Sequence, residues 1–213
     1  MPTYVTALSI AYLLGSIPFG YLLVRTFRKE DIRAVGSGNI GATNVARSGS
    51  TGLGIATLVL DLGKGYAAVA ITHYLALHCT RSCCSSPFQL MAIAAAVAVA
   101  AHVYPIWLGF KGGKGVATAF GVFLALEPYA ALSLLGVFAV VFAITRFVSL
   151  ASILGAAAFF YFGPLFAPGR LSHTSMAALF FIPALVIAKH HQNIRRLLSG
   201  TEPKFGRSKK VTA

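Results

Sequence analysis

The sequence predicts an all-α integral membrane protein with seven transmembrane helices, one of them short, an external N-terminus and an internal C-terminus. Of its 213 residues, 57% are hydrophobic and only 11% are charged, which is more apolar surface than a soluble domain of this size buries. Uncharged runs long enough to cross about 30 Å of hydrocarbon recur along the chain. The basic residues stand between these runs, and their distribution predicts the orientation.

The first half of the chain contains three predicted spans. Thr3–Val24 carries no charge and includes small residues and Pro18, which suit close helix packing in lipid. A polar and basic segment, residues 25–51, separates it from the second span, Gly52–Leu77. The third, Phe88–Phe110, is an uncharged run rich in alanine.

The second half begins with Val116–Thr145, which is too long for one span and too short for two. Glu127 is its only charge, and Pro128 disfavours the helical conformation of the residue before it. We therefore expect a short helix and a full span on either side of this break. The elements predicted here are Val116–Leu126, Tyr129–Thr145, Phe147–Phe166 and Leu171–Ala188.

Seven crossings place nearly all Lys and Arg residues of the loops on one side of the membrane. The other side then receives only Arg81 and Arg170. Six crossings, with Val116–Thr145 as a single span, would divide the basic residues almost evenly. The positive-inside rule therefore selects seven crossings and predicts a cytoplasmic C-terminus.

The chain is predicted to form one membrane-embedded domain, residues 1–213, that ends in a flexible basic tail, residues 207–213. Its net charge of +13 comes from basic residues between spans and in the tail, without a nucleic-acid-binding motif, so we expect no nucleic acid partner. Cys79, Cys83 and Cys84 match no zinc or redox spacing and predict at most one disulfide bridge. We expect no metal.

A basic, glycine-dense turn between two apolar runs predicts an anion-binding loop. Glycine lets backbone N–H groups converge on one point, and lysine adds positive charge. A helix that begins after Gly115 would direct its free N–H groups at the same point. The alternative is a loop whose lysines only set the membrane topology. This second glycine loop contains Gly109, Lys111, Gly112, Gly113, Lys114 and Gly115.

A first glycine loop, residues 36–47, lies between the first two spans. Its glycines match the dinucleotide pattern G-x-G-x-x-G, but a membrane span precedes it where that pattern needs a β-strand, so we reject a Rossmann unit. Its remaining groups suit a phosphate: backbone amides and the side chains of Ser37, Asn39, Asn44 and Arg47.

Polar residues inside the predicted spans give two further expectations. Asp61 and Lys64 lie on one helix face, and we expect them to pair with each other and face the bundle interior, with direct substrate contact as the alternative. His102 could be catalytic, but a histidine among alanines is more often hydrogen-bonded within the bundle.

The segment after the last span carries His190, Asn193, Arg196 and Glu202, the first three at helical spacing. A basic helix at the membrane surface would explain the arginines but not the histidine, asparagine and glutamate. We therefore expect this segment to contribute to the same polar site as the two glycine loops.

Four motifs occur in order along the chain. They are Ser37-Gly38-Asn39-x-Gly41-x-Thr43-Asn44 with Arg47, Leu60-Asp61-x-x-Lys64-Gly65, Lys111-Gly112-Gly113-Lys114-Gly115-Val116-Ala117-Thr118, and His190-x-x-Asn193-x-x-Arg196-Leu197-x-x-Gly200-x-Glu202. This combination is specific, and essentially the whole chain resembles the bacterial acyl-phosphate-dependent glycerol-3-phosphate acyltransferases. The resemblance implies seven membrane helices in the bacterial inner membrane, one active site on the cytoplasmic face, and no metal or cofactor.

The resemblance also implies a reaction, the transfer of a fatty acyl group from acyl phosphate to the 1-hydroxyl of glycerol 3-phosphate. The products are lysophosphatidate and phosphate, in the first acylation of phospholipid synthesis. Because an acyl phosphate is already activated and the sequence offers no catalytic triad, we expect direct transfer without an acyl-enzyme. The base would be His190 or the donor's own phosphate.

The residues expected to act in this site come from all three cytoplasmic segments. The expected catalytic residues are His190, Ser37, Lys111 and Asn193, and the expected phosphate-binding residues are Ser37, Gly38, Asn39, Gly41, Thr43, Asn44, Arg47, Lys111, Gly112, Gly113, Lys114, Gly115, Thr118, Asn193, Arg196 and Glu202. We expect a monomer. A phosphate or organophosphate transporter is the alternative function, although the sequence lacks the internal repeat that it predicts.

Overall fold

The computed structural model describes residues 2–78, 86–167, 169 and 172–206, and every regular element in them is helical. The predicted cysteine pairing, Arg81, Arg170 and the basic tail lie outside the described residues. In chain order the elements are α1 (Pro2–Ser16), α2 (Phe19–Arg28), η1 (Ile32–Ala34), α3 (Ala42–Arg47), α4 (Thr51–His78), α5 (Pro87–Val103), η2 (Ile106–Leu108), α6 (Val116–Leu126), α7 (Pro128–Thr145), α8 (Val148–Phe166), α9 (His173–Lys189) and α10 (His191–Leu198).

Five segments of the described chain are long and apolar enough to cross a membrane, and a sixth is obtained when α9 and α10 are counted together across their 51° bend. The short helix α6 has the predicted bounds, Val116–Leu126. Its 11 residues extend about 16 Å, roughly half of the hydrocarbon thickness. The helical membrane fold is therefore confirmed, whereas seven crossings and the orientation stay predictions.

Two predicted spans are interrupted in the structure. The span predicted at Thr3–Val24 is found at Thr3–Arg28, where α1 ends at Ser16 and α2 begins after Pro18. The span predicted at Phe88–Phe110 is found at Pro87–Leu108, where α5 ends at Val103, just before Tyr104 and Pro105. Proline explains both breaks, since it lacks an N–H group and restricts the residue before it.

Small residues allow the helices to approach closely. A Cβ atom added to Gly65 of α4 would overlap the backbone oxygen of Thr118 in α6, and one added to Gly121 would overlap that of Leu62. Gly15 of α1 packs in the same way against Ala98 of α5. In a membrane, such close backbone contact replaces the hydrophobic effect as the main source of helix association.

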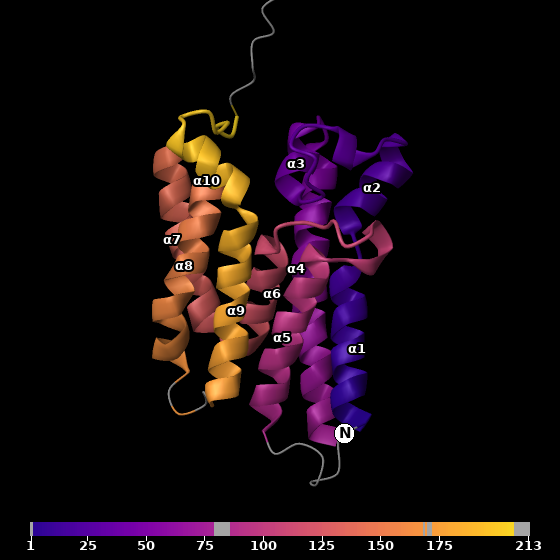
Figure 1. Ribbon diagram of the computed structural model, residues 1–213, viewed down its shortest axis with the longest axis vertical. Helices are drawn as coiled ribbons and strands as arrows, with labels where there is room; N and C mark the ends of the chain where they lie inside the picture. The colour runs from indigo at the N-terminus through magenta and orange to yellow at the C-terminus, as the bar shows by residue number, and fades with distance from the viewer. Residues whose placement is uncertain (1, 79–85, 168, 170–171, 207–213) are drawn as a thin grey trace, which may run out of the picture.

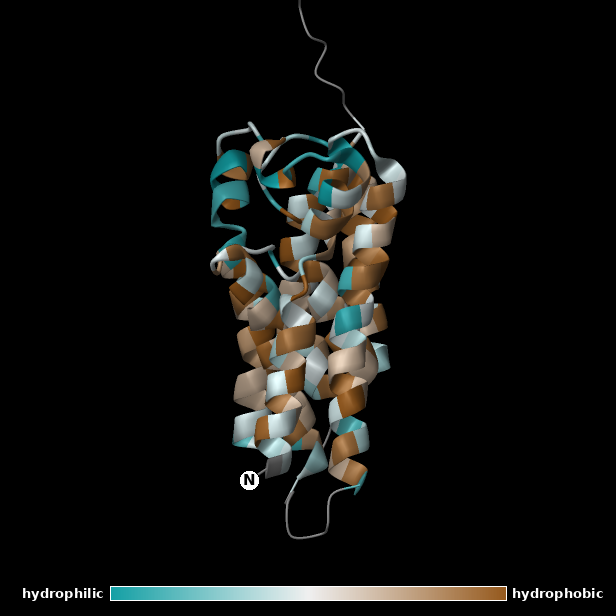
Figure 2. Cartoon of the chain, turned by 90° about the vertical axis from the view of Figure 1, so that its right-hand side faces the viewer, coloured by the Kyte–Doolittle hydropathy of each residue, from teal (hydrophilic) through white to brown (hydrophobic). Residues whose placement is uncertain are grey.

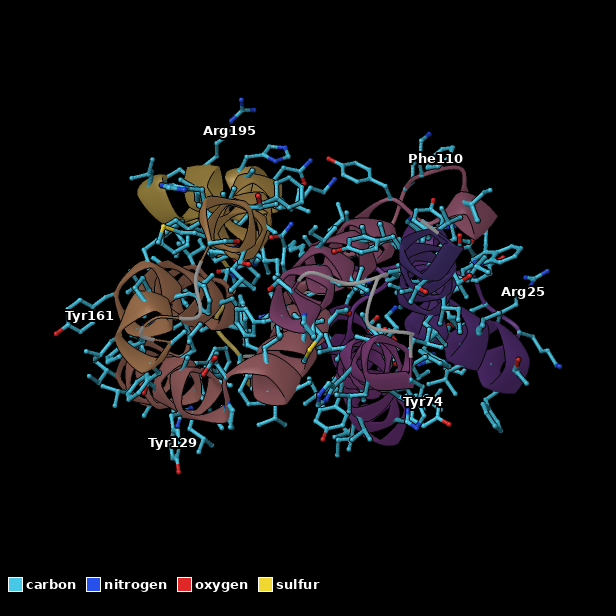
Figure 3. The ribbon with its side chains drawn as sticks, turned by 90° about the horizontal axis from the view of Figure 1, so that it is seen from below. Arg25, Tyr74, Phe110, Tyr129, Tyr161 and Arg195 are labelled. Carbon is cyan, nitrogen blue, oxygen red and sulfur yellow. The ribbon has the colours of Figure 1, made fainter. Side chains whose placement is uncertain are left out.

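The helices form two groups joined by α6 and by the packing of α5 against α9 (Figure 1). One group contains α1, α4 and α5, the other α7, α8 and α9, while α6 contacts α4 on one side and α7 on the other. Large side chains on the outside point away from the bundle, including Tyr74, Tyr129 and Tyr161 (Figure 3). This exposed apolar surface fits contact with lipid.

Polar residues gather at one end of the bundle, where α2, α3 and α10 lie (Figures 1 and 2). Three contacts bring separate loops to the C-terminal segment there. Arg47 donates to the Pro203 carbonyl at 3.2 Å, Lys114 donates to Asn193, and the N–H group of Phe205 donates to the Arg146 carbonyl at 2.9 Å. The two glycine loops and the C-terminal segment thus share one end.

The close contact between α4 and α6 gives a test of the fold. The Gly65→Ala substitution is expected to lower the stability by about 1–3 kcal/mol. The added methyl group would collide with the Thr118 backbone in α6, which cannot rotate away as a flexible side chain could. Gly63→Ala, two residues earlier on α4, is the control, since nothing lies within 4 Å of its added Cβ. Melting of both variants in detergent measures the effect, and equal melting temperatures would contradict this packing.

Candidate active site

The second glycine loop folds back on the end of α5. The N–H groups of Gly112 and Gly113 each donate, at 3.1 Å, to the carbonyls of Val103 and His102 respectively. Positive φ angles at Gly109, Phe110 and Gly115 (58°, 62° and 82°) produce the turns on either side. The loop therefore delivers Lys114 and the N-terminus of α6 to the polar end.

Lys114 begins a chain of side-chain contacts that runs into the C-terminal segment. Its ammonium donates to Asn193 Oδ1 at 2.5 Å, and Asn193 Nδ2 donates to Glu202 Oε1 at 2.7 Å. Glu202 also accepts from Ser149 at 2.6 Å and from Arg196 Nε at 2.7 Å. One buried carboxylate thus orients an asparagine and an arginine beside the lysine.

Arg47 adds the first glycine loop to this arrangement through its bond to the Pro203 carbonyl. Arg47, Lys114 and Arg196 are close enough for their charges to influence one another, and Glu202 is the carboxylate among them. Positive charge is therefore in excess where the loops meet. Such an excess, next to the N-terminus of α6, favours an anion, although the N–H groups of Gly112 and Gly113 are already used within the protein.

The charge states follow from burial and from neighbouring groups. Burial lowers the pKa of Lys114 to about 8, and the positive charges of Arg196 and Arg47 act in the same direction, against Glu202. Burial raises the pKa of Glu202, but hydrogen bonds from Ser149, Asn193 and Arg196 outweigh this and lower it overall. At neutral pH the lysine is mostly protonated and the glutamate is ionised.

His190 lies just beyond the end of α9 and is buried. Its Nδ1 is 2.7 Å from the Val186 carbonyl, and because a carbonyl only accepts, Nδ1 carries the proton. Burial lowers the pKa of His190 to about 4, helped by the charge of Lys114 and opposed by the Val186 bond. His190 is therefore neutral at physiological pH, with the lone pair on Nε2.

The first glycine loop is shaped by its own asparagines. The Asn44 amide donates to the carbonyls of Val35 and Asn39 at 3.0 and 2.8 Å, and accepts from the Ser37 N–H group at 2.9 Å. Asn39 accepts from Gly41 N–H at 2.8 Å. We expected both asparagine side chains to bind phosphate. In the structure the Asn44 side chain is buried, and these hydrogen bonds join it to the backbone around its own loop.

The other predicted residues fall into three groups. Ser37 and Lys111 are exposed, and in the described part of the chain their side chains make no hydrogen bond or ion pair with the cluster around Lys114. Gly38, Gly41 and Thr43 lie half-buried in the first loop. Thr118 is 0% exposed and packs where α6 meets Gly65, so the expected phosphate contact from its side chain is not supported.

Two participants were not expected from the sequence. Ser149 reaches Glu202 from the start of α8, and the Pro203 carbonyl receives Arg47. Glu202 itself was expected to bind phosphate but orients protein groups instead. No local pattern marks a serine at the beginning of an apolar helix or a backbone carbonyl as part of a site.

The fold and this site together define an integral membrane protein whose polar end gathers the cationic side chains of Arg47, Lys114 and Arg196. The model of the glycerol-3-phosphate acyltransferase family matches residues 5–200, and the chain belongs to this family of acyltransferases of phospholipid synthesis. Relatives named glycerol-3-phosphate acyltransferase include one from Geobacter sulfurreducens, 46% identical over 92% of this chain and 95% of that protein. Another, from Anaeromyxobacter sp. (strain Fw109-5), is 44% identical over 91% and 92%.

Two crystal structures of PlsY (YgiH), an integral membrane glycerol 3-phosphate acyltransferase, have the same fold. The glycerol 3-phosphate form has a TM-score of 0.83 and is 38% identical, over 95% of this chain and 96% of that chain. The lysophosphatidic acid form has a TM-score of 0.79 and is 37% identical, over 95% of each chain. These matches favour an enzyme over the transporter alternative, and they confirm the family resemblance seen in the motifs.

The charge of Lys114 gives a prediction for pH dependence. We expect the protonated Lys114 to attract the phosphate of glycerol 3-phosphate, and because its pKa is about 8, kcat/KM for glycerol 3-phosphate should fall as the pH rises through about 8. Phosphate monoesters lose their last proton at lower pH, so the substrate does not cause this decline. Lys114→Arg should move this fall in kcat/KM to higher pH. A wild-type kcat/KM that stays constant up to pH 9.5 would contradict the assignment of the fall to Lys114.

Ser149 gives a second prediction. Ser149→Ala leaves a buried carboxylate oxygen of Glu202 short of one donor, which should cost about 1–3 kcal/mol of stability and raise KM for glycerol 3-phosphate several-fold. Ser152→Ala is the matched control, because Ser152 is equally buried on α8 but donates only to the Val148 carbonyl. Melting curves and KM values that agree between the two variants would exclude a role for Ser149 in the site.

Proposed function

We propose that this protein transfers a fatty acyl group from acyl phosphate to the 1-hydroxyl of glycerol 3-phosphate. The hydroxyl oxygen attacks the acyl carbon, the bond between that carbon and the phosphate oxygen breaks, and lysophosphatidate and inorganic phosphate are released. The observation that carries the proposal is the convergence of Arg47, Lys114 and Arg196 on one end of the bundle. Both substrates carry phosphate, so both need cations and N–H donors in close proximity.

The two glycine loops suggest a division of the substrates. Glycerol 3-phosphate is placed on the second loop, where Lys114 and the free N–H groups at the start of α6 face the same space. The donor phosphate is placed on the first loop with Arg47, whose bond to Pro203 holds it toward the other segment. Lys111, exposed beside the second loop, can move to the donor phosphate or to the developing oxyanion.

Direct transfer, without an acyl-enzyme, is supported by the chemistry of the donor and by the surroundings of Ser37. An acyl phosphate has a good leaving group, so the enzyme need only position and neutralise charge. In the described residues, the Ser37 side chain has no hydrogen-bonded base that would activate it as a nucleophile.

The proton of the acceptor hydroxyl needs a final acceptor. A histidine whose pKa lies near 4 is a weak base, which favours the donor phosphate as proton acceptor. His190 Nε2 then receives a hydrogen bond from the hydroxyl and orients it, while Asn193 supplies a polar contact beside Lys114.

The orientation is proposed from charge. The polar end holds most of the basic residues of the chain, so the positive-inside rule places it in the cytoplasm of a bacterial cell, with the protein in the inner membrane as a monomer. Glycerol 3-phosphate then reaches the site from water and the donor from the lipid layer.

The donor is tested with purified protein and labelled glycerol 3-phosphate. Parallel reactions contain acyl phosphate, acyl-CoA or acyl-carrier protein of the same chain length. Lysophosphatidate from acyl phosphate alone is the expected result. Equal rates with either thioester would contradict the proposed donor.

The absence of an acyl-enzyme is tested separately. Labelled acyl phosphate is mixed with the protein without acceptor, and the denatured protein is examined for bound label and for a burst of phosphate. Neither is expected, with Ser37→Ala as the reference for background. His190→Gln should lose only a few-fold in rate if His190 only orients the hydroxyl, and a loss of about 100-fold or more would identify it as the base.

A further inference from the structure

A buried polar cluster lies directly beneath the second glycine loop and is not used by the proposed chemistry. It consists of Asp61 and Lys64 on α4 and His102 at the end of α5, which are 3%, 5% and 4% exposed. Lys64 Nζ is 2.9 Å from Asp61 Oδ1, and His102 Nδ1 is 3.6 Å from the same oxygen. Burying such groups at membrane depth is costly, so their presence calls for a function.

His102 contacts the loop with both its backbone and its side chain. Its carbonyl accepts the hydrogen bond from Gly113. Its ring fills the space where a side chain of Gly113 would stand: a Cβ added there would overlap Nε2 and lie 2.9 Å from Cε1 and 3.0 Å from Cδ2. The three nearest atoms to that position all belong to this one ring. The position of Gly113 therefore depends on where the imidazole stands.

Asp61 is the group that can hold the imidazole. The His102 nitrogen facing Asp61 makes no hydrogen bond within the described residues, so its orientation rests on this polar contact. Asp61 is itself positioned by Lys64, which also donates to the Ile17 carbonyl at 2.6 Å. A contact sequence thus runs from α4 through the His102 ring to the backbone that precedes Lys114.

We propose that His102, held by Asp61, is a positioning residue for the acceptor phosphate. The imidazole determines how closely Gly113 approaches the end of α5. It thereby orients the neighbouring N–H groups and the Lys114 side chain, but it does not contact a substrate itself. This inference rests on the proposed placement of glycerol 3-phosphate on the second glycine loop. It gives the polar contacts of His102 within the bundle a function in substrate binding, without making His102 a catalytic residue.

Two adjacent glycines allow a sharp test. Gly113→Ala should weaken glycerol 3-phosphate binding about 10-fold or more, because the methyl group displaces the loop from the imidazole. His102→Ala should weaken binding several-fold. In the double variant the smaller side chain at 102 makes room for the methyl group, so binding should be several-fold tighter than in Gly113→Ala alone.

Gly112→Ala provides the control for this rescue. A Cβ added at Gly112 would overlap the His102 carbonyl oxygen and Pro105, which remain when the imidazole is removed. His102→Ala should therefore give no recovery with Gly112→Ala.

Binding is measured without donor, by calorimetry with glycerol 3-phosphate on purified protein in detergent, next to melting curves for folding. Where His102→Ala does not fold, His102→Asn replaces it, since it removes Cε1 and Nε2 but keeps a polar atom toward Asp61. In turnover assays of the His102 variants, KM for acyl phosphate and kcat should stay within about two-fold, because a positioning effect on the acceptor loop is confined to acceptor binding.

Each outcome decides the question. Rescue at position 113 but not at 112 supports positioning by the imidazole. Additive losses in both double variants overturn it, as do equal losses for acceptor and donor. If the wild-type protein does not bind glycerol 3-phosphate, both the proposed function and this inference are wrong. If the wild-type protein binds it and the affinity losses of the single variants add up in both double variants, only this inference is wrong.

Discussion

The ion pair between Asp61 and Lys64 is the constraint on which the polar end of this protein depends. Two charges buried at membrane depth are stable only when each has partners, and here the partners come from several elements. Lys64 reaches the Ile17 carbonyl at the break between α1 and α2, and Asp61 reaches His102 at the end of α5. The chain leaves the bundle for its glycine loops beyond these two points, so one ion pair supports both loops.

The site above this pair is assembled from segments that only the fold brings together. Arg47, Lys114 and Arg196 repel one another, and Glu202 offsets part of that repulsion while its hydrogen bonds orient Asn193 and Arg196. The remaining excess of positive charge is what an anionic substrate would neutralise. Glu202 therefore serves the site by organising cations, a role that a carboxylate can fill without approaching phosphate.

The sequence predicted the features that have local causes. The bounds of α6 follow from a glycine before it and a proline after it, and the Asp61–Lys64 pair follows from helical spacing. The hydrogen bond from Ser149 to Glu202 joins residues that are 53 positions apart, and the one from Arg47 to Pro203 joins residues that are 156 positions apart. The local sequence pattern does not predict contacts over such separations. The hydrogen bonds of Asn44 within its own loop could not be predicted, because composition does not tell whether an amide faces a ligand or its own backbone.

The half-length of α6 has a consequence for where the chemistry takes place. Because α6 is only about 16 Å long and starts at the second glycine loop, it lies below the level of α3 and α10 (Figure 1). An acyl phosphate has its chain in lipid and its phosphate in water, which leaves its reactive carbonyl at the boundary. With the donor and acceptor proposed above, a loop anchored to α5 at this depth would bring the acceptor to that boundary, and the donor would not need to leave the lipid layer. The break after α5 at Tyr104–Pro105 is therefore what allows a membrane helix to end in the second glycine loop, where we propose that the acceptor binds.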